Sequence, residues 1–147
     1  MANGHVVAVC KGPGGIPKHP VDEARVDADG LEGDAHRFHL HGGRDRAVCL
    51  FFLSDYASLQ ADGVSCEPPG AFGENLTLDG LDPTLLRAGD RLRVGDEVRL
   101  EIHSHSLIES DCDCAIQHLG VWRGSCAGRC QGAPPTALHL VLDSPII

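Results

Sequence analysis

The feature that most constrains this chain is the way glycine and proline interrupt its apolar runs. The 147 residues include 18 glycines and nine prolines, and most apolar runs between them are short. Such punctuation favours short strands and tight turns over long helices. No run approaches the roughly 18 apolar residues of a membrane span, so we expect no contact with a membrane. The chain is long enough for one core, which predicts a single domain over residues 1–147.

The strongest local pattern is a hairpin, because apolar residues alternate on both arms around Gly95–Asp96. Period two on both arms indicates paired strands with one buried face, and glycine at the turn accepts a positive φ. Residues 54–62 predict one helix of about two turns, with Ser54 as its N-cap and Gly63 at its end. Further strands are predicted at 5–9, 21–27, 46–53, 75–78 and 137–142, with 46–53 central. Together these elements predict a mainly β fold, a barrel with few short helices.

Charge and cysteine content exclude several classes of function. The net charge of -9 argues against nucleic acid and anionic membranes as partners. Seven cysteines cannot all pair internally, and the N-terminus lacks a signal-peptide pattern. We therefore expect free thiols in a reducing cytoplasm, with Cys10 and Cys49 buried and unreactive in strands.

Polar and titratable residues concentrate in residues 30–48, immediately before an apolar segment. His36, His39 and His41 could ligate a metal, contact an anion, or be solvated. Gly42–Gly43 precede Arg44, Asp45 and Arg46, and could form a nest of backbone N–H groups for a phosphate or pterin-type anion. The alternative is a plain loop whose glycines supply positive φ.

A second candidate lies at Glu74 and Asn75, which follow Gly73. Asparagine offers both a donor and an acceptor, which suits recognition of a heterocycle edge. The alternative is turn chemistry, since asparagine tolerates the left-handed conformation.

These segments together resemble the MOSC domain, named after the C-terminal domain of molybdenum-cofactor sulfurases. The matching pieces are IPKHPV around Lys18, then GLEGDAH, HGGRDRAV, GAFGENLTLDGL, and the LRAGDRLRVGD hairpin leading into LEI, within residues 5–102. The resemblance implies a compact β-barrel that binds the molybdenum cofactor, as a sulfur carrier or as a reductase of N-hydroxylated compounds. The residues implied to bind the cofactor are Lys18, His36, His41, Gly42, Gly43, Arg44, Asp45, Arg46, Glu74 and Asn75. Pyridoxal phosphate belongs to a separate domain of related sulfurases, for which this chain has no room.

The resemblance also implies a cysteine shortly after the LEI segment, carrying sulfur or ligating molybdenum. That position falls near Glu109, and the nearest thiols are Cys112 and Cys114, which are our candidates for the catalytic thiol and the metal ligand. Residues 103–147 otherwise depart from the family pattern, as a divergent tail or as the product of a reading-frame change. Cys112, Cys114, Cys126 and Cys130 could instead form a structural zinc site, although their spacings differ from the usual C-x-x-C pairs.

Two functional hypotheses from different classes therefore stand beside the zinc alternative. One is a molybdenum-cofactor protein that works with a sulfur-donor or electron-donor protein and a small-molecule substrate. The other is a non-catalytic accessory module that keeps the fold but has lost the reactive thiol. The sequence does not specify the oligomeric state.

Overall fold

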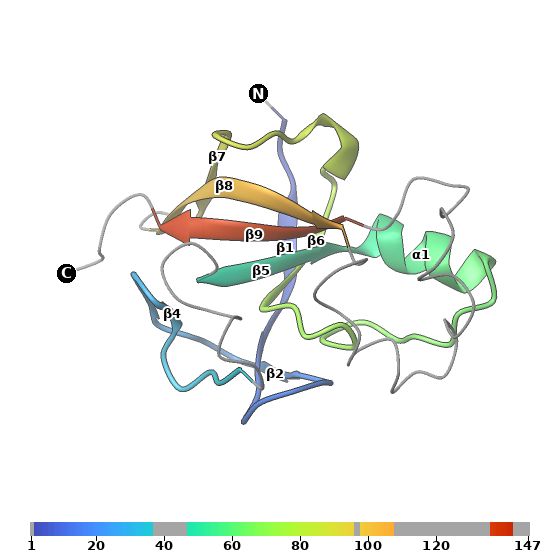
Figure 1. Ribbon diagram of the computed structural model, residues 1–147, viewed down its shortest axis with the longest axis horizontal. Helices are drawn as coiled ribbons and strands as arrows, with labels where there is room; N and C mark the ends of the chain where they lie inside the picture. Colours follow the sequence, from blue (N-terminus) through green and yellow to red (C-terminus); the bar gives the residue numbers. More distant parts are fainter. Residues whose placement is uncertain (1, 37–46, 96–97, 108–135, 143–147) are drawn as a thin grey trace.

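In the part of the chain that the structure describes, the fold is built around a seven-stranded sheet with one α-helix at one end of its central strand (Figure 1). The computed structural model describes residues 2–36, 47–95, 98–107 and 136–142. Its elements in chain order are β1 His5–Lys11, β2 His19–Val21, β3 Val26–Asp27, β4 Gly30–Leu31, β5 Val48–Phe52, α1 Leu53–Ala61, β6 Leu76–Asp79, the 3-10 helix η2 Pro83–Leu85, β7 Arg91–Val94, β8 Val98–Leu107 and β9 Thr136–Leu142.

Strand β5 is the centre of the sheet, as its apolar sequence predicted. The strand order is β2-β1-β6-β5-β9-β8-β7, with β5 parallel to β6 and antiparallel to β9. Side chains alternate between the two faces of a strand. Residues of β5 therefore contribute to a hydrophobic cluster on each face of the sheet. Leu50 and Phe52 join one cluster, whereas Phe51 packs with Tyr56 and Leu59 of α1 in the other.

Helix α1 confirms the predicted helix but begins differently. Its N-cap is Phe52, which makes no side-chain capping bond, so the predicted cap at Ser54 is wrong. The helix continues directly from β5, and burial of Tyr56 and Leu59 takes the place of a polar cap. Its end is as predicted: Gly63 has φ +87°, and Val64 N–H donates to Leu59 O at 2.9 Å. With the Gly63 bond to Gln60 O, this is a Schellman motif.

The predicted hairpin is confirmed as β7 and β8. Val94 pairs with Val98, and Gly95 has φ +63°. The predicted strand over 21–27 is wrong for its middle, because β2 ends at Val21 and β3 begins at Val26. A short two-stranded sheet of β3 and β4 forms instead.

Part of the segment beyond residue 103 belongs to the sheet. Strand β8 continues to Leu107 and pairs with β9, the strand predicted at 137–142, across a register shift between Ile102 and Ser104. The alternation of apolar residues in the sequence ends at His103, where the register shifts. The backbone pairing of β8 with β9 nevertheless continues to Leu107.

The mainly β class is confirmed, but the expected closed barrel is not formed. In the described residues the sheet ends at β2 on one edge and β7 on the other. These edge strands have three and four residues, and each pairs with one neighbour only. Figure 1 shows β1 running across β5, β8 and β9, so the sheet is strongly curved without closing. No helix within the described ranges has the length and apolar character needed to cross a membrane.

Candidate functional site

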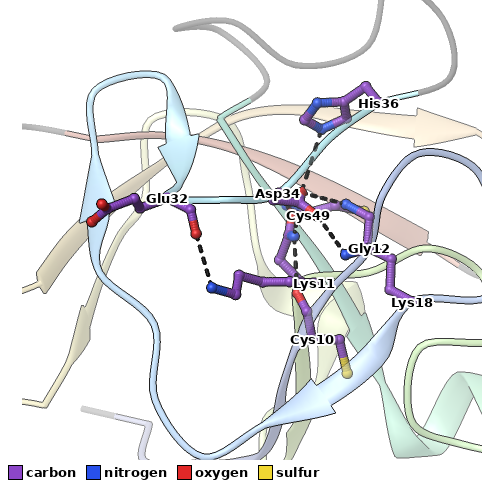
Figure 2. A network of polar contacts seen from close by, with 9 residues as sticks. Cys10, Lys11, Gly12, Lys18, Glu32, Asp34, His36 and Cys49 are labelled. Atoms are coloured by element: carbon purple, nitrogen blue, oxygen red, sulfur yellow. Dashed lines mark hydrogen bonds and ion pairs between the residues drawn. The ribbon is translucent and has the colours of Figure 1, made fainter.

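A buried carboxylate, Asp34, joins three segments that are far apart in the sequence (Figure 2). Lys18 Nζ lies 2.6 Å from Asp34 Oδ2, and the two side chains are 4% and 2% exposed. Asn75 Nδ2 donates to the same oxygen at 2.9 Å, and the backbone N–H of Gly12 donates to Oδ1 at 2.9 Å. The ion pair is therefore desolvated and its carboxylate has donors on both oxygens.

These contacts decide the ionisation of Asp34. Burial alone raises the pKa of the carboxyl group, but hydrogen bonds from Lys18, Asn75 and Gly12 outweigh it and hold the pKa below its ordinary value. Asp34 is therefore an anion at neutral pH and balances the charge of Lys18. Asp34 is not among the site residues predicted from the sequence, although it lies inside the GLEGDAH segment. Only its burial against Lys18 identifies it.

Asn75 connects this network to the centre of the sheet by hydrogen bonds to β1 and β5. Its Oδ1 accepts from Cys49 N–H at 3.1 Å, and its Nδ2 also donates to Cys10 O at 3.2 Å. Its backbone continues the ladder, with Asn75 N–H on Cys49 O and Cys10 N–H on Asn75 O. The side chain thus bridges β1 and β5 where β6 begins. The left-handed turn considered for Asn75 is excluded, because every described residue with positive φ is a glycine.

Contacts among the described residues hold the chain on either side of residues 37–46. The His36 side chain is 27% exposed, and its Nε2 lies 3.8 Å from Asp34 Oδ2. Ala35 N–H donates to Gly12 O at 2.9 Å. On the other side, a Cβ at Gly30 would overlap the carbonyl oxygen of Ala47, so β4 packs directly on the start of β5. Residues 36 and 47 are therefore both held by described contacts.

A second buried carboxylate, Glu74, lies on the α1 side of the sheet. It is 0% exposed, and its Oε1 accepts from Tyr56 OH at 2.6 Å, Gly70 N–H at 2.8 Å and Thr77 OH at 2.9 Å. Its Oε2 accepts from Phe72 N–H at 3.3 Å. Burial and the neighbouring Glu74 raise the pKa of Tyr56, so its phenol stays neutral. All of these contacts are with the protein itself, and a contact of Glu74 with a cofactor stays a prediction.

Two of the thiols in the described residues, Cys10 and Cys66, are poor nucleophiles. Burial and the negative charge of Glu74 raise the pKa of Cys10 to about 11, against a lowering effect of Lys18. Burial, Glu67 and Glu74 also raise the pKa of Cys66. Cys10 is buried as predicted, whereas Cys49 is only partly buried, so the prediction of a buried thiol is wrong for Cys49. Cys10 and Cys66 are free thiols.

Several predicted site residues fall outside the described residues, so their roles remain predictions. They are His39, His41, Gly42, Gly43, Arg44, Asp45, Arg46, Cys112, Cys114, Cys126 and Cys130. Among the residues that are described, no three His, Cys, Asp or Glu side chains converge as a metal site would require. In the described residues, the partly exposed imidazole of His36 lies beside a buried ion pair. This arrangement suits the support of an anion site, and it contains no activated thiol.

Comparison with known proteins connects part of the sequence to one family. Residues 37–106 match the MOSC domain, so the resemblance inferred from the sequence is confirmed over that span. A protein named "Reductase" from Gibberella moniliformis is 35% identical over 79 residues, covering 51% of this chain and 14% of that protein. "Protein YiiM" from Escherichia coli is 37% identical over 89 residues, covering 57% of this chain and 40% of that protein. The chain thus spans less than half the length of both relatives.

The fold is also shared with a solved structure. The crystal structure of YiiM from Geobacillus stearothermophilus superposes with a TM-score of 0.71 at 17% identity. The match covers 96% of this chain and 68% of that one. At this identity the likeness concerns the fold alone, and it extends well beyond the 70 or so residues at which the family pattern is detected.

Proposed function

Because residues 37–106 carry the MOSC-domain pattern and the chain has the fold of YiiM, we propose that this protein binds the molybdenum cofactor. We propose further that it acts in sulfur transfer or in the reduction of N-hydroxylated compounds, with a sulfur-donor or electron-donor protein as partner. The name of the Gibberella protein is compatible with the reductase alternative, although this chain matches only 14% of its length. The activity of the whole protein is therefore part of the proposal.

The observation that carries the proposal is the meeting of three family-like segments in one buried network. Lys18 comes from IPKHPV, Asp34 from GLEGDAH and Asn75 from the GENL segment, and all three are joined by bonds of 2.6 and 2.9 Å. A buried ion pair is weak evidence for stability, because desolvation can exceed the Coulombic gain. The network does, however, fix residues on both sides of the segment that holds the predicted anion cradle. It supports a role in presenting that segment to a ligand.

The residue types of the predicted anion cradle would suit a cofactor that carries a phosphate and a pterin. Arg44 and Arg46 would pair with the phosphate as bidentate donors, and Gly42 and Gly43 would supply backbone N–H groups. His36 and His41 would add imidazole donors, with Lys18, Asp45, Glu74 and Asn75 holding the cradle in place. The cofactor, when bound, supplies two-electron chemistry at molybdenum. The thiolate of Cys112 or Cys114 would ligate the metal or carry sulfur as a persulfide.

The proposal is tested by analysing protein expressed in a host that makes the cofactor. We expect molybdenum and pterin to copurify with the protein, or intact mass to show one added sulfur. Arg44→Ala with Arg46→Ala should lower the molybdenum content, whereas Arg99→Ala, which removes an exposed guanidinium on β8, should not. Protein without molybdenum, pterin or persulfide would overturn the proposal.

The second candidate is the accessory module without a reactive thiol. It is favoured by the raised pKa of Cys10 and Cys66 and by the absence of cysteine at the family position near Glu109. In that case Cys112→Ala and Cys114→Ala would leave cofactor content unchanged. Loss of molybdenum or persulfide in either variant would favour the enzyme.

A further inference from the structure

The two buried carboxylates are joined through the turn over residues 70–73. This turn lies between the Glu74 network on the α1 side and the Lys18–Asp34 pair on the other. Its amides bond to one network and its first carbonyl bonds to the other. A displacement at one network would therefore reach the other through a few atoms of backbone.

We propose that Tyr56 and Glu74 are positioning residues of the candidate site, which act by holding this turn against Lys18. The proposal rests on the proposed function only in taking the Lys18–Asp34 pair as the support of the ligand site. Neither residue needs to touch a ligand. Their effect is to fix where Lys18, and through it Asp34, can lie.

The first step is the capture of three consecutive amides by buried side chains. Gly70 N–H and Phe72 N–H donate to Glu74, and Ala71 N–H donates to Tyr56 OH at 3.0 Å. Tyr56 is 1% exposed, and its ring packs on Phe51 and Phe72 at centroid distances of 5.0 and 5.3 Å. The hydroxyl group that receives the amide is thus held by aromatic packing on the ring that carries it.

The second step runs from the turn to Lys18. Gly70 O accepts from Lys18 N–H at 2.9 Å, and a Cβ at Gly70 would overlap the carbonyl oxygen of Lys18. The two backbones are therefore in direct contact. On its other side Lys18 packs on Gly12, whose added Cβ would lie 3.1 Å from Lys18 Cγ. Held from both sides, the side chain places Nζ 2.6 Å from Asp34.

Tyr56 and Glu74 could instead only stabilise the fold. Two matched variants distinguish this stabilising role from the positioning role. Tyr56→Phe and Thr77→Val each remove one hydroxyl that donates to Glu74 Oε1, at 2.6 and 2.9 Å, from a buried residue. Only the Tyr56 hydroxyl also accepts an amide of the turn. If Tyr56 positions the turn, the Lys18 side chain becomes more exposed in Tyr56→Phe than in Thr77→Val. If Tyr56 only stabilises the fold, the exposure of Lys18 is the same in the two variants.

The experiment uses the fact that the chain has only two lysines, Lys11 and Lys18. The folded full-length protein is treated briefly with an acetylating reagent, and the acetylation of each lysine is measured by peptide mass spectrometry. Lys11, whose Nζ bonds to Glu32 O in an exposed setting, is the internal reference. We expect Lys18 to be protected in the wild type and in Thr77→Val. In Tyr56→Phe the Lys18-to-Lys11 ratio should rise about fivefold or more, as expected when a buried amide loses its partner.

A rise in Lys18 acetylation in Tyr56→Phe but not in Thr77→Val supports the proposal. Equal exposure of Lys18 in the two variants, or labelling that only follows global unfolding measured by denaturant, would overturn the proposal. If Tyr56→Phe does not fold, Glu74→Gln takes its place, because it keeps Oε1 as an acceptor but sets an NH₂ group against Phe72 N–H. The assay involves no molybdenum, so its failure is distinct from failure of the proposed function.

Discussion

At the scale of the residue, two glycines with nearly the same φ have very different surroundings. Gly63 and Gly70 have φ of +87° and +84°. A Cβ at Gly63 would meet nothing within 4 Å, whereas one at Gly70 would overlap the backbone of Lys18. The backbone conformation is thus equally unfavourable for a side chain at both sites, and only Gly70 adds a steric conflict.

We therefore predict that Gly63→Ala lowers the free energy of unfolding by about 1–2 kcal/mol, the cost of a left-handed non-glycine residue. Gly70→Ala should cost clearly more, above about 4 kcal/mol, because the turn must leave Lys18. Urea denaturation of both variants measures the difference. Equal losses would show that the contact between Gly70 and Lys18 is not close in solution.

Asp34 makes a prediction about acid stability. Its folded pKa is below the unfolded value of about 3.9, so the stability it contributes is present above that pH and is lost as the pH falls through the folded pKa. Asp34→Asn leaves Lys18 without a counter-charge, and we expect it to cost about 3–5 kcal/mol near neutral pH. The variant should also lose less stability than wild type below about pH 4. Urea midpoints across this range measure both effects.

The control for Asp34 is Glu23→Gln, which removes an exposed carboxylate between β2 and β3. It should leave the acid dependence close to that of the wild type. If Asp34→Asn also follows the wild-type curve, the carboxylate is not the anion that the buried contacts indicate.

At the scale of the element, β9 has the least expected position. It lies between β5 and β8 and pairs with both, although the chain reaches it last. The hairpin of β7 and β8 could be predicted, because both arms and the turn lie within 17 residues of sequence. The position of β9 could not, because its partner β5 is some 90 residues away and strand patterns do not specify partners across such a distance.

Hydrogen exchange tests this central position. Amides of β9 should be protected to a degree comparable with those of β5, because both strands are hydrogen-bonded on two sides. Amides of the three-residue edge strand β2 should exchange much faster. Rapid exchange throughout 136–142, with protection retained in β5, would contradict the strand order.

At the scale of the whole molecule, the sheet separates two hydrophobic clusters that share β5. Each cluster loses packing contacts if β5 is displaced, so we expect both clusters to unfold in one transition. Tyr56, the single tyrosine of the chain, reports on this transition from inside one cluster.

We predict that Tyr56 does not ionise while the protein is folded. Its pKa is raised by burial and by Glu74, so its contribution to stability is present below the unfolded pKa of about 10 and is lost as the pH rises. In an alkaline titration the ultraviolet absorbance of phenolate should appear together with loss of far-UV circular dichroism. Denatured protein should titrate near the ordinary value. Phenolate in a protein that keeps its native circular dichroism would contradict the buried Tyr56–Glu74 bond.

The sequence by itself determined the features that depend on neighbouring residues: the hairpin around Gly95, the end of α1 at Gly63, the apolar strand β5 and the family-like segments. Tertiary structure alone decided which of these meet. The pairing of Lys18 with Asp34, the bond from Ala71 N–H to Tyr56, and the place of β9 join residues 15 to about 90 positions apart. The physical reason is that periodicity and turn chemistry act over a few residues. The choice among distant partners is made by burial, which requires every desolvated charge and amide to find a partner.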